Sequence, residues 1–161
     1  MHSLELFAGA GGLALATANA GFRHRAVVEW NPNACATLRF NHEAGLPQLA
    51  DAEIVEGDVS HYDFKQHAGR VQLVSGGPPC QPFSIGGAHG GMDDERNMFP
   101  HAIRAVREIQ PQAFIFENVK GLLRESFASY FQYIIHQLSC LDIERWGDEE
   151  CTDHLRGSTS G

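Results

Sequence analysis

"HSLELFAGAGGLALATANAG", residues 2–21, contains the unit from which the rest of the fold follows. Residues 2–7 form an apolar, strand-like run, and residues 8–12 form a glycine-rich turn. Residues 13–20 are helix-prone and end at Gly21, a residue type that favours a helix C-terminus. This stretch therefore predicts a strand, a tight turn and a helix in succession.

The same alternation continues along the chain. Further strands are predicted at 24–30, 52–58, 71–77 and 112–119, and further helices at 32–41, 98–109 and 126–140. Asn31 and Pro32 suit the cap and first position of the second helix. Such alternation predicts an α/β fold: a Rossmann-like, mostly parallel sheet with helices on both faces.

Length and composition indicate one domain. The chain has 161 residues, of which 43% are hydrophobic and 20% charged, as in a soluble globular protein. We expect a partial domain over residues 1–140, because five strands are few for such a sheet, and a polar tail or linker over 141–161.

Charge and cysteine content limit the functional classes. The formal charge of −8 argues, taken alone, against a nucleic-acid partner. No apolar run is long enough to cross a membrane, and the N-terminus lacks a secretory pattern. The four cysteines include no C-x-x-C pair, and the histidines form no ligand motif, so we expect no disulfide framework, no metal and a cytoplasmic protein.

Every unusual segment follows a predicted strand. In parallel α/β sheets, ligands bind at the carboxyl ends of the strands. The segments in these positions are "AGAGG", "EWN", "GDV", "GGPPCQPFS" and "ENV". We therefore predict the functional site at this edge of the sheet.

Three of these segments suit an adenosine-containing ligand with a small anionic part. The glycine-rich turn favours an anionic group, although a nicotinamide cofactor would suit it equally. Glu29 is placed to accept from a ribose diol, Trp30 to stack on an adenine, and Asp58 to accept from its amino group. The alternatives are a surface charge for Glu29, core packing for Trp30 and a turn cap for Asp58.

The fourth segment holds a cysteine in a stiff backbone. Pro78, Pro79 and Pro82 restrict the chain around Cys80. Glu117 ends the next predicted strand, so the thiol and the carboxyl group are expected to converge on one pocket if the two strands are neighbours. A nucleophile beside a proton donor suits attack on an electron-poor carbon. The alternative is a small buried cysteine that packs as an apolar residue.

Taken together, these segments resemble the DNA (cytosine-5)-methyltransferase family. The matching stretches lie within residues 2–123, in the order and spacing of the family. They are "ELFAGAGG", "EW", "GD", "GGPPCQPFS", "ERNMF" and "FENV".

The resemblance implies a fold of the S-adenosylmethionine-dependent methyltransferase type. The residues that it implies for S-adenosyl-L-methionine are Phe7, Ala8, Gly9, Gly11, Gly12, Glu29, Trp30, Asp58, Val59 and Pro78. In the implied reaction Cys80 adds to C6 of a cytosine flipped out of duplex DNA, Glu117 holds or protonates N3, and Asn118 stabilises the catalytic loop. The residues implied near the substrate are Gln81, Ser84, Gly86, Gly87 and Arg96, the last with a surface salt bridge as its alternative.

Several segments expected of that family are not found in this sequence. They are a Q-x-R-x-R segment, a target-recognition domain and a late "GN" segment. The resemblance thus implies part of a split or truncated enzyme, active on DNA at the bacterial nucleoid, with a second polypeptide as a possible partner. The alternatives are an inactive module that binds S-adenosylmethionine or a partner, an RNA cytosine-5 methyltransferase and, more distantly, a nicotinamide dehydrogenase.

Overall fold

The computed structural model describes residues 1–79 and 97–141. Residues 80–96 and 142–161 lie outside this part, and with them Cys80 and nearly all of the predicted tail. The division into a domain and a tail therefore stays a prediction.

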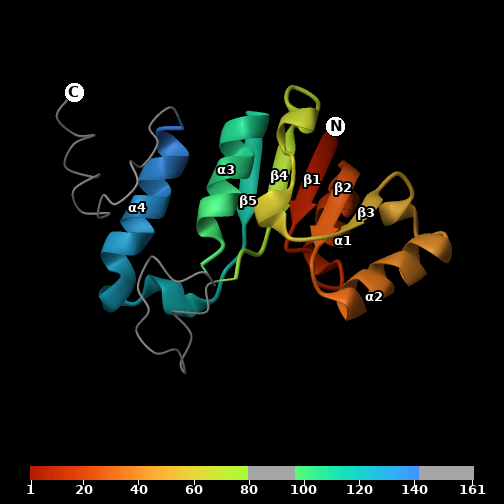
Figure 1. Ribbon diagram of the computed structural model, residues 1–161, viewed down its shortest axis with the longest axis horizontal. Helices are drawn as coiled ribbons and strands as arrows, with labels where there is room; N and C mark the ends of the chain where they lie inside the picture. The colour runs from red at the N-terminus through yellow and green to blue at the C-terminus, as the bar shows by residue number, and fades with distance from the viewer. Residues whose placement is uncertain (80–96, 142–161) are drawn as a thin grey trace.

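Five parallel strands form one sheet (Figure 1). They are β1 (His2–Leu6), β2 (Arg23–Glu29), β3 (Glu53–Glu56), β4 (Leu73–Gly76) and β5 (Ala113–Phe116). The strand order is β3-β2-β1-β4-β5, with every neighbouring pair parallel. The chain adds β2 and β3 on one side of β1 and then β4 and β5 on its other side. The order of the strands therefore changes direction between β1 and β4, and ligands bind at such a point in parallel α/β sheets. The predicted parallel α/β class is confirmed. The strand predicted at 24–30 is shifted by one residue from β2, and the other predicted strands are one to four residues too long.

The helices cover both faces of the sheet. They are α1 (Gly12–Asn19), α2 (Pro32–Glu43), α3 (Phe99–Ile109) and α4 (Ala128–Ser139). Val106 and Ile109 of α3 pack with Leu4 and Leu6 of β1, whereas Leu38 of α2 packs against Val27. Successive residues of a strand point to opposite faces, so these two clusters lie on opposite sides of the sheet. In Figure 1, α2 lies beside β3 at one end of the sheet and α4 lies beyond β5 at the other.

The second helix begins as its sequence predicts. Asn31 is extended at the cap position, and its side-chain oxygen accepts hydrogen bonds from the backbone N–H groups of Asn33 and Ala34 at 2.9 and 3.2 Å. Pro32 occupies the first helical position, where its missing N–H costs nothing. This capping fixes the direction in which the chain leaves β2, directly after Glu29 and Trp30.

A carboxyl group is buried in the middle of the sheet. The side chain of Glu5 is 1% exposed and accepts a hydrogen bond from the hydroxyl of Ser75, its register partner on β4. Burial raises the pKa of Glu5 from 4.5 to about 7, and the hydrogen bond from Ser75 only partly offsets this. Glu5 lies just before the turn after β1, and Ser75 lies just before Gly76 and Gly77 at the end of β4.

We expect Glu5→Gln to remove a pH dependence of folding. The unfolded chain ionises Glu5 near pH 4.5 and the folded chain near pH 7, so the stabilisation present below pH 4.5 is lost as the pH rises through this window. The slope approaches about 1.4 kcal/mol per pH unit. Urea denaturation between pH 4.5 and 8 should show this slope in the difference between wild type and Glu5→Gln. Exposed Glu53→Gln is the control, and a flat difference for Glu5→Gln would contradict the assignment.

The outer strand β5 is poorly covered. Among the described residues it pairs only with β4, and the side chains of both Phe114 and Ile115 are exposed. Phe114 stacks on Phe116, which contacts the core on the α3 side, so Ile115 points to the opposite face. Apolar side chains are therefore exposed on both faces of this strand.

Candidate cofactor and catalytic site

A pocket of about 460 Å³ lies at the carboxyl ends of the strands. Its wall is formed by Phe7, Gly9, Val28, Glu29, Trp30, Gly57, Asp58, Val59, Gly77, Pro79 and Met98. The volume falls in the range of small-molecule sites. The pocket brings together the turn after β1, the ends of β2 and β3, the exit of β4 and the start of α3, as the alternation of the sequence predicts.

The turn after β1 has an unusual backbone. Phe7 and Gly9 both have a φ of 53° and Gly11 a φ of 96°. A positive φ is costly for a bulky residue such as Phe7, and this strain lies directly at the pocket wall. At Gly11 a side chain would also approach Leu38 Cδ2 to 2.8 Å, so this glycine serves the packing of the turn on α2.

Four residues predicted to hold the cofactor do not line this pocket. Ala8 is buried in the cluster with Val27 and Leu38, and Gly12 is the first residue of α1. Gly11 and Pro78 are likewise absent from its wall. For these positions the structure shows a role in the shape of the turn or of the segment after β4, while a contact with a cofactor stays a prediction.

Glu29 connects the turn to the end of β2. Its carboxylate accepts hydrogen bonds from the N–H groups of Gly9 at 2.8 Å, Trp30 at 3.0 Å and Asn31 at 2.8 Å. The residue is 7% exposed, which excludes the alternative of a surface charge. A carboxylate has about four acceptor sites, so one remains for a hydroxyl of a bound ligand.

Trp30 lines the pocket with an exposed ring. The residue is 74% exposed, which excludes core packing as the reason for its presence. An exposed indole in a pocket wall offers a flat apolar surface to a planar ring.

We expect Trp30→Ala to weaken ligand binding without affecting folding. Stacking of a base on an aromatic side chain contributes about 1–3 kcal/mol, so the dissociation constant for S-adenosylhomocysteine should rise about tenfold or more. Isothermal titration calorimetry measures the constant and urea denaturation the stability. Phe40→Ala removes an equally exposed aromatic residue of α2 outside the pocket, and its binding should match wild type. Unchanged binding in Trp30→Ala would argue against a stacked ring at this position.

Asp58 both caps a turn and faces the pocket. It precedes the short 3-10 helix η2 (Val59–His61), and its carboxylate accepts a hydrogen bond from Ser60 N at 2.8 Å. Hydrogen bonds from Ser60 lower the pKa of Asp58, so the group stays ionised at neutral pH. Asp58 therefore caps the turn, as the alternative interpretation predicts, and it also lines the pocket.

The carboxyl end of β5 lies against the segment that leads to Cys80. Glu117 N donates to Gly76 O at 3.0 Å, and a side chain built on Gly77 would lie 3.4 Å from Glu117 Oε2. Asn118 Nδ2 donates to Pro78 O at 2.7 Å. β4 and β5 are neighbours, as the expected convergence of thiol and carboxyl group requires.

Pro79 is held from the other side. Met98 N, directly before α3, donates to Pro79 O at 3.3 Å. The chain is therefore anchored directly before and shortly after residues 80–96. The remaining predicted residues, Cys80, Gln81, Ser84, Gly86, Gly87 and Arg96, lie outside the described part, so their roles stay predictions.

Sequence reasoning missed several wall residues. Val28, Gly57, Gly77, Pro79 and Met98 line the pocket but were not assigned to it. Gly77 and Pro79 belong to the quoted "GGPPCQPFS" segment, so its position after a strand was the available signal. Met98 belongs to the quoted "ERNMF" segment, but this segment does not follow a strand, and Met98 reaches the pocket through the packing of α3.

The described part of the chain shows no cluster of metal ligands and no membrane-spanning helix. Residues 1–79 and 97–141 contain no group of three or more histidine, cysteine, aspartate or glutamate side chains arranged to hold a metal ion. Within the same residues, no helix combines the length and apolar character needed to cross a membrane.

Comparison with known proteins identifies the family of this chain. The chain matches the family model of the C-5 cytosine-specific DNA methylases over residues 1–143. It therefore belongs to the C-5 cytosine-specific DNA methylase family.

Relatives in this family include named type II methyltransferases. The chain is 45% identical to M.NgoMIV of Neisseria gonorrhoeae over 139 residues, which are 86% of this chain and 42% of that protein. It is 41% identical to M.NaeI of Lentzea aerocolonigenes, covering 86% of this chain and 32% of the relative. This chain thus spans less than half the length of either protein.

Solved structures share the fold. A prophage-encoded protein from E. coli, described as a DNA modification methyltransferase, superposes with a TM-score of 0.67 at 32% identity, covering 86% of this chain and 38% of that one. The DNMT2 mutant of Spodoptera frugiperda superposes with a TM-score of 0.57 at 23% identity, covering 85% of this chain and 40% of that one. The latter likeness concerns the fold alone.

Proposed function

We propose that this chain is the cofactor-binding and catalytic part of an enzyme that methylates C5 of cytosine in duplex DNA. The observation that supports this most is the position of Glu117 beside Gly77, with Asn118 bonded to Pro78 O at 2.7 Å. An acid thus stands beside the segment that leads into Cys80, at the same edge of the sheet as the pocket. Family membership over residues 1–143 supports the same reaction.

The pocket residues fit S-adenosylmethionine. Glu29 has an acceptor position left for a ribose hydroxyl, Trp30 presents an exposed ring to an adenine, and Asp58 is an ionised acceptor for its amino group. When bound, this cofactor supplies an electrophilic methyl group on a positively charged sulfur. The described residues bind and orient it, and the rigid turn after β1 leaves little reorganisation to binding.

In the proposed reaction, the base is attacked at C6. The Cys80 thiolate forms a C–S bond to C6, while Glu117 donates a proton or hydrogen bond to N3 and withdraws electrons from the ring. C5 then becomes nucleophilic and accepts the methyl group. Transfer of the C5 proton to solvent, return of any proton on N3 to Glu117 and departure of the thiolate restore the aromatic ring as 5-methylcytosine. Pro78 and Pro79 limit the backbone conformations before Cys80, which favours a fixed approach of the sulfur.

We infer that a further polypeptide, continuous with this chain or separate, completes the enzyme. The chain spans 42% and 32% of two named relatives, and β5 exposes apolar side chains on both faces. The formal charge of −8 makes this part a poor DNA-binding surface, so the added part would contribute the phosphate contacts and the reading of sequence. We place the reaction in the bacterial cytoplasm, at the nucleoid.

The test is transfer of a labelled methyl group. The chain, alone and mixed with any polypeptide encoded beside it, is incubated with labelled S-adenosylmethionine and either duplex DNA or RNA. Label in DNA supports the proposal, and label in the mixture alone supports a separate second polypeptide. Label in RNA only would make it an RNA methyltransferase. Cofactor binding without transfer in any mixture would leave an inactive binding module, and absence of cofactor binding would overturn the proposal.

A further inference from the structure

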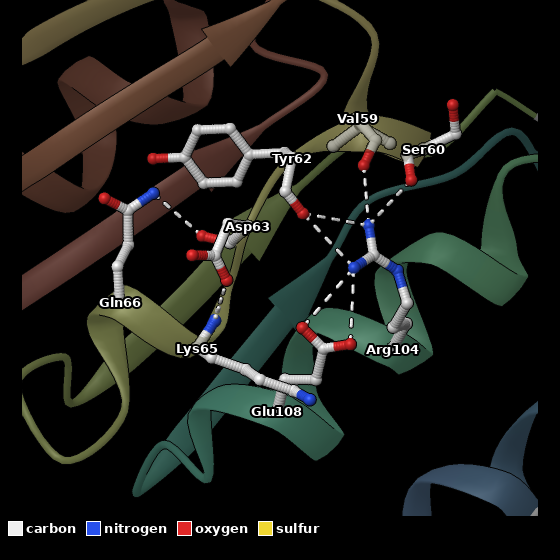
Figure 2. A network of polar contacts seen from close by, with 8 residues as sticks. All are labelled: Val59, Ser60, Tyr62, Asp63, Lys65, Gln66, Arg104 and Glu108. Atoms are coloured by element: carbon white, nitrogen blue, oxygen red, sulfur yellow. Dashed lines mark hydrogen bonds and ion pairs between the residues drawn. The ribbon is translucent and has the colours of Figure 1, made fainter.

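Arg104 of α3 makes the densest set of polar contacts around the pocket wall, although its side chain does not line the pocket (Figure 2). Its Nη2 donates to the carbonyl oxygens of Val59 at 2.8 Å, Ser60 at 3.2 Å and Tyr62 at 3.2 Å. Its Nη1 donates to Tyr62 O at 3.2 Å and contacts the Glu108 carboxylate at 3.3 Å. The guanidinium also lies 4.3 Å from the centre of the Phe64 ring, which is fully buried.

These hydrogen bonds from Arg104 hold the η2 turn through its backbone carbonyl groups. Asp58 holds the amino end of the same turn by accepting from Ser60 N. Asp58 and Val59 both line the pocket, so the two charged side chains together fix this part of its wall. Hydrogen bonds from a charged donor are about twice as strong as neutral ones, and only the planar fork of arginine reaches several carbonyl groups at once.

The same helix also holds the segment before Cys80. Met98, directly before α3, lines the pocket and donates to Pro79 O at 3.3 Å. Arg104 therefore links the η2 turn, which follows Asp58, to α3, whose preceding residue Met98 is bonded to Pro79 O. These segments are distant in sequence, and the guanidinium is a direct link between them.

We propose that Arg104 is a positioning residue that sets the selectivity of this wall for an amino-bearing purine such as adenine. The proposal rests on the proposed function, in which Asp58 accepts from the adenine amino group. Arg104 acts through the backbone of Val59, Ser60 and Tyr62, and it holds Asp58 and Val59 where a purine edge meets them. Loss of the guanidinium frees the turn, so that the carboxylate no longer distinguishes an amino group from a carbonyl oxygen.

The test compares two ligands that differ only at this edge. S-adenosylhomocysteine carries an amino group at C6 and an acceptor at N1, and S-inosylhomocysteine carries a carbonyl oxygen and an N–H group in these places. We expect the wild-type chain to prefer the first by a clear factor. We expect Arg104→Gln to raise the dissociation constant for S-adenosylhomocysteine about tenfold and to bring the ratio of the two constants toward one. Arg104→Lys keeps the charge without the fork and should also lose most of the ratio.

Arg107→Gln is the matched control. Arg107 lies on the same helix, but its guanidinium donates to Leu141 O and Gln137 Oε1, on the α4 side. Its loss should lower stability and leave the ligand ratio unchanged. A double-mutant cycle with Asp58→Asn adds a second measurement, because residues that act through one another give non-additive changes in binding free energy.

The outcomes separate the two proposals. If the wild-type chain binds neither ligand, the proposed function fails, and this inference with it. If wild type discriminates and the Arg104 variants keep the full ratio, or if the cycle with Asp58→Asn is additive, the role of Arg104 is wrong while the proposed function stands. If Arg104→Gln does not fold, Arg104→Lys decides between these results.

Discussion

Replacing Cys80 by serine should abolish covalent capture of duplex DNA that contains 5-fluorocytosine. In the proposed reaction the sulfur bonds to C6, and release requires loss of a proton from C5. Fluorine at C5 cannot leave as a proton, so the wild-type protein should remain attached to the DNA. A serine hydroxyl is far less ionised and a weaker nucleophile than a thiolate, so we expect the methyl-transfer rate to fall about a thousandfold or more.

The experiment uses this chain together with the polypeptide that completes it, S-adenosylmethionine and a fluorinated duplex. Denaturing electrophoresis reports the covalent complex. Cys140→Ser is the matched control, because Cys140 is a free, partly buried cysteine directly after α4 and away from the pocket wall. Capture of DNA by Cys80→Ser at the wild-type level would show that another group attacks the base.

Replacing Glu29 by alanine should have the largest effect on cofactor binding. The change removes a nearly buried carboxylate that accepts from three backbone N–H groups, those of Gly9, Trp30 and Asn31, and leaves these donors without their acceptor. It also removes the acceptor that we propose for a ribose hydroxyl. We expect the dissociation constant for S-adenosylhomocysteine to rise at least about a hundredfold and the free energy of unfolding to fall by about 2–4 kcal/mol.

Glu56→Ala is the matched control. Glu56 is the register partner of Glu29 on β3, but it is exposed and pairs with Arg39. An exposed ion pair contributes about 1 kcal/mol or less, so this variant should fold and bind almost as wild type. Glu29→Gln keeps an oxygen acceptor but loses the charge, and it should fall between the two. Wild-type affinity in Glu29→Ala would remove Glu29 from the ligand site.

The order of the elements and the edge of the sheet that carries the site could be predicted from local pattern. Strand-like runs, helix caps such as Asn31, and glycine turns are properties of a few neighbouring residues, and they determine where the strands end. Glu29 and Trp30 follow from the same logic, because the residue that ends a parallel strand lies at the ligand edge. The exposure of Trp30 and the burial of Glu29 needed the structure.

Contacts between distant segments could not be predicted in this way. Arg104 reads in the sequence as an ordinary charged residue of an amphipathic helix, and its bonds to carbonyl groups more than 40 residues away arise only when α3 packs beside η2. Glu5 reads as an outward residue of an alternating strand, yet the sheet is covered on both faces and Ser75 supplies a partner. Such long-range contacts depend on packing, which local pattern does not encode.

Among residues 1–79 and 97–141, no strand pairs with the side of β5 away from β4, and this has a consequence for the chain in isolation. A strand with unpaired backbone groups and apolar residues on both faces is a template for the addition of another strand. Self-association through such a template grows with protein concentration and competes with assembly into the active enzyme. We therefore expect co-production with the proposed completing polypeptide to give more soluble material and fewer aggregates than production of this chain alone.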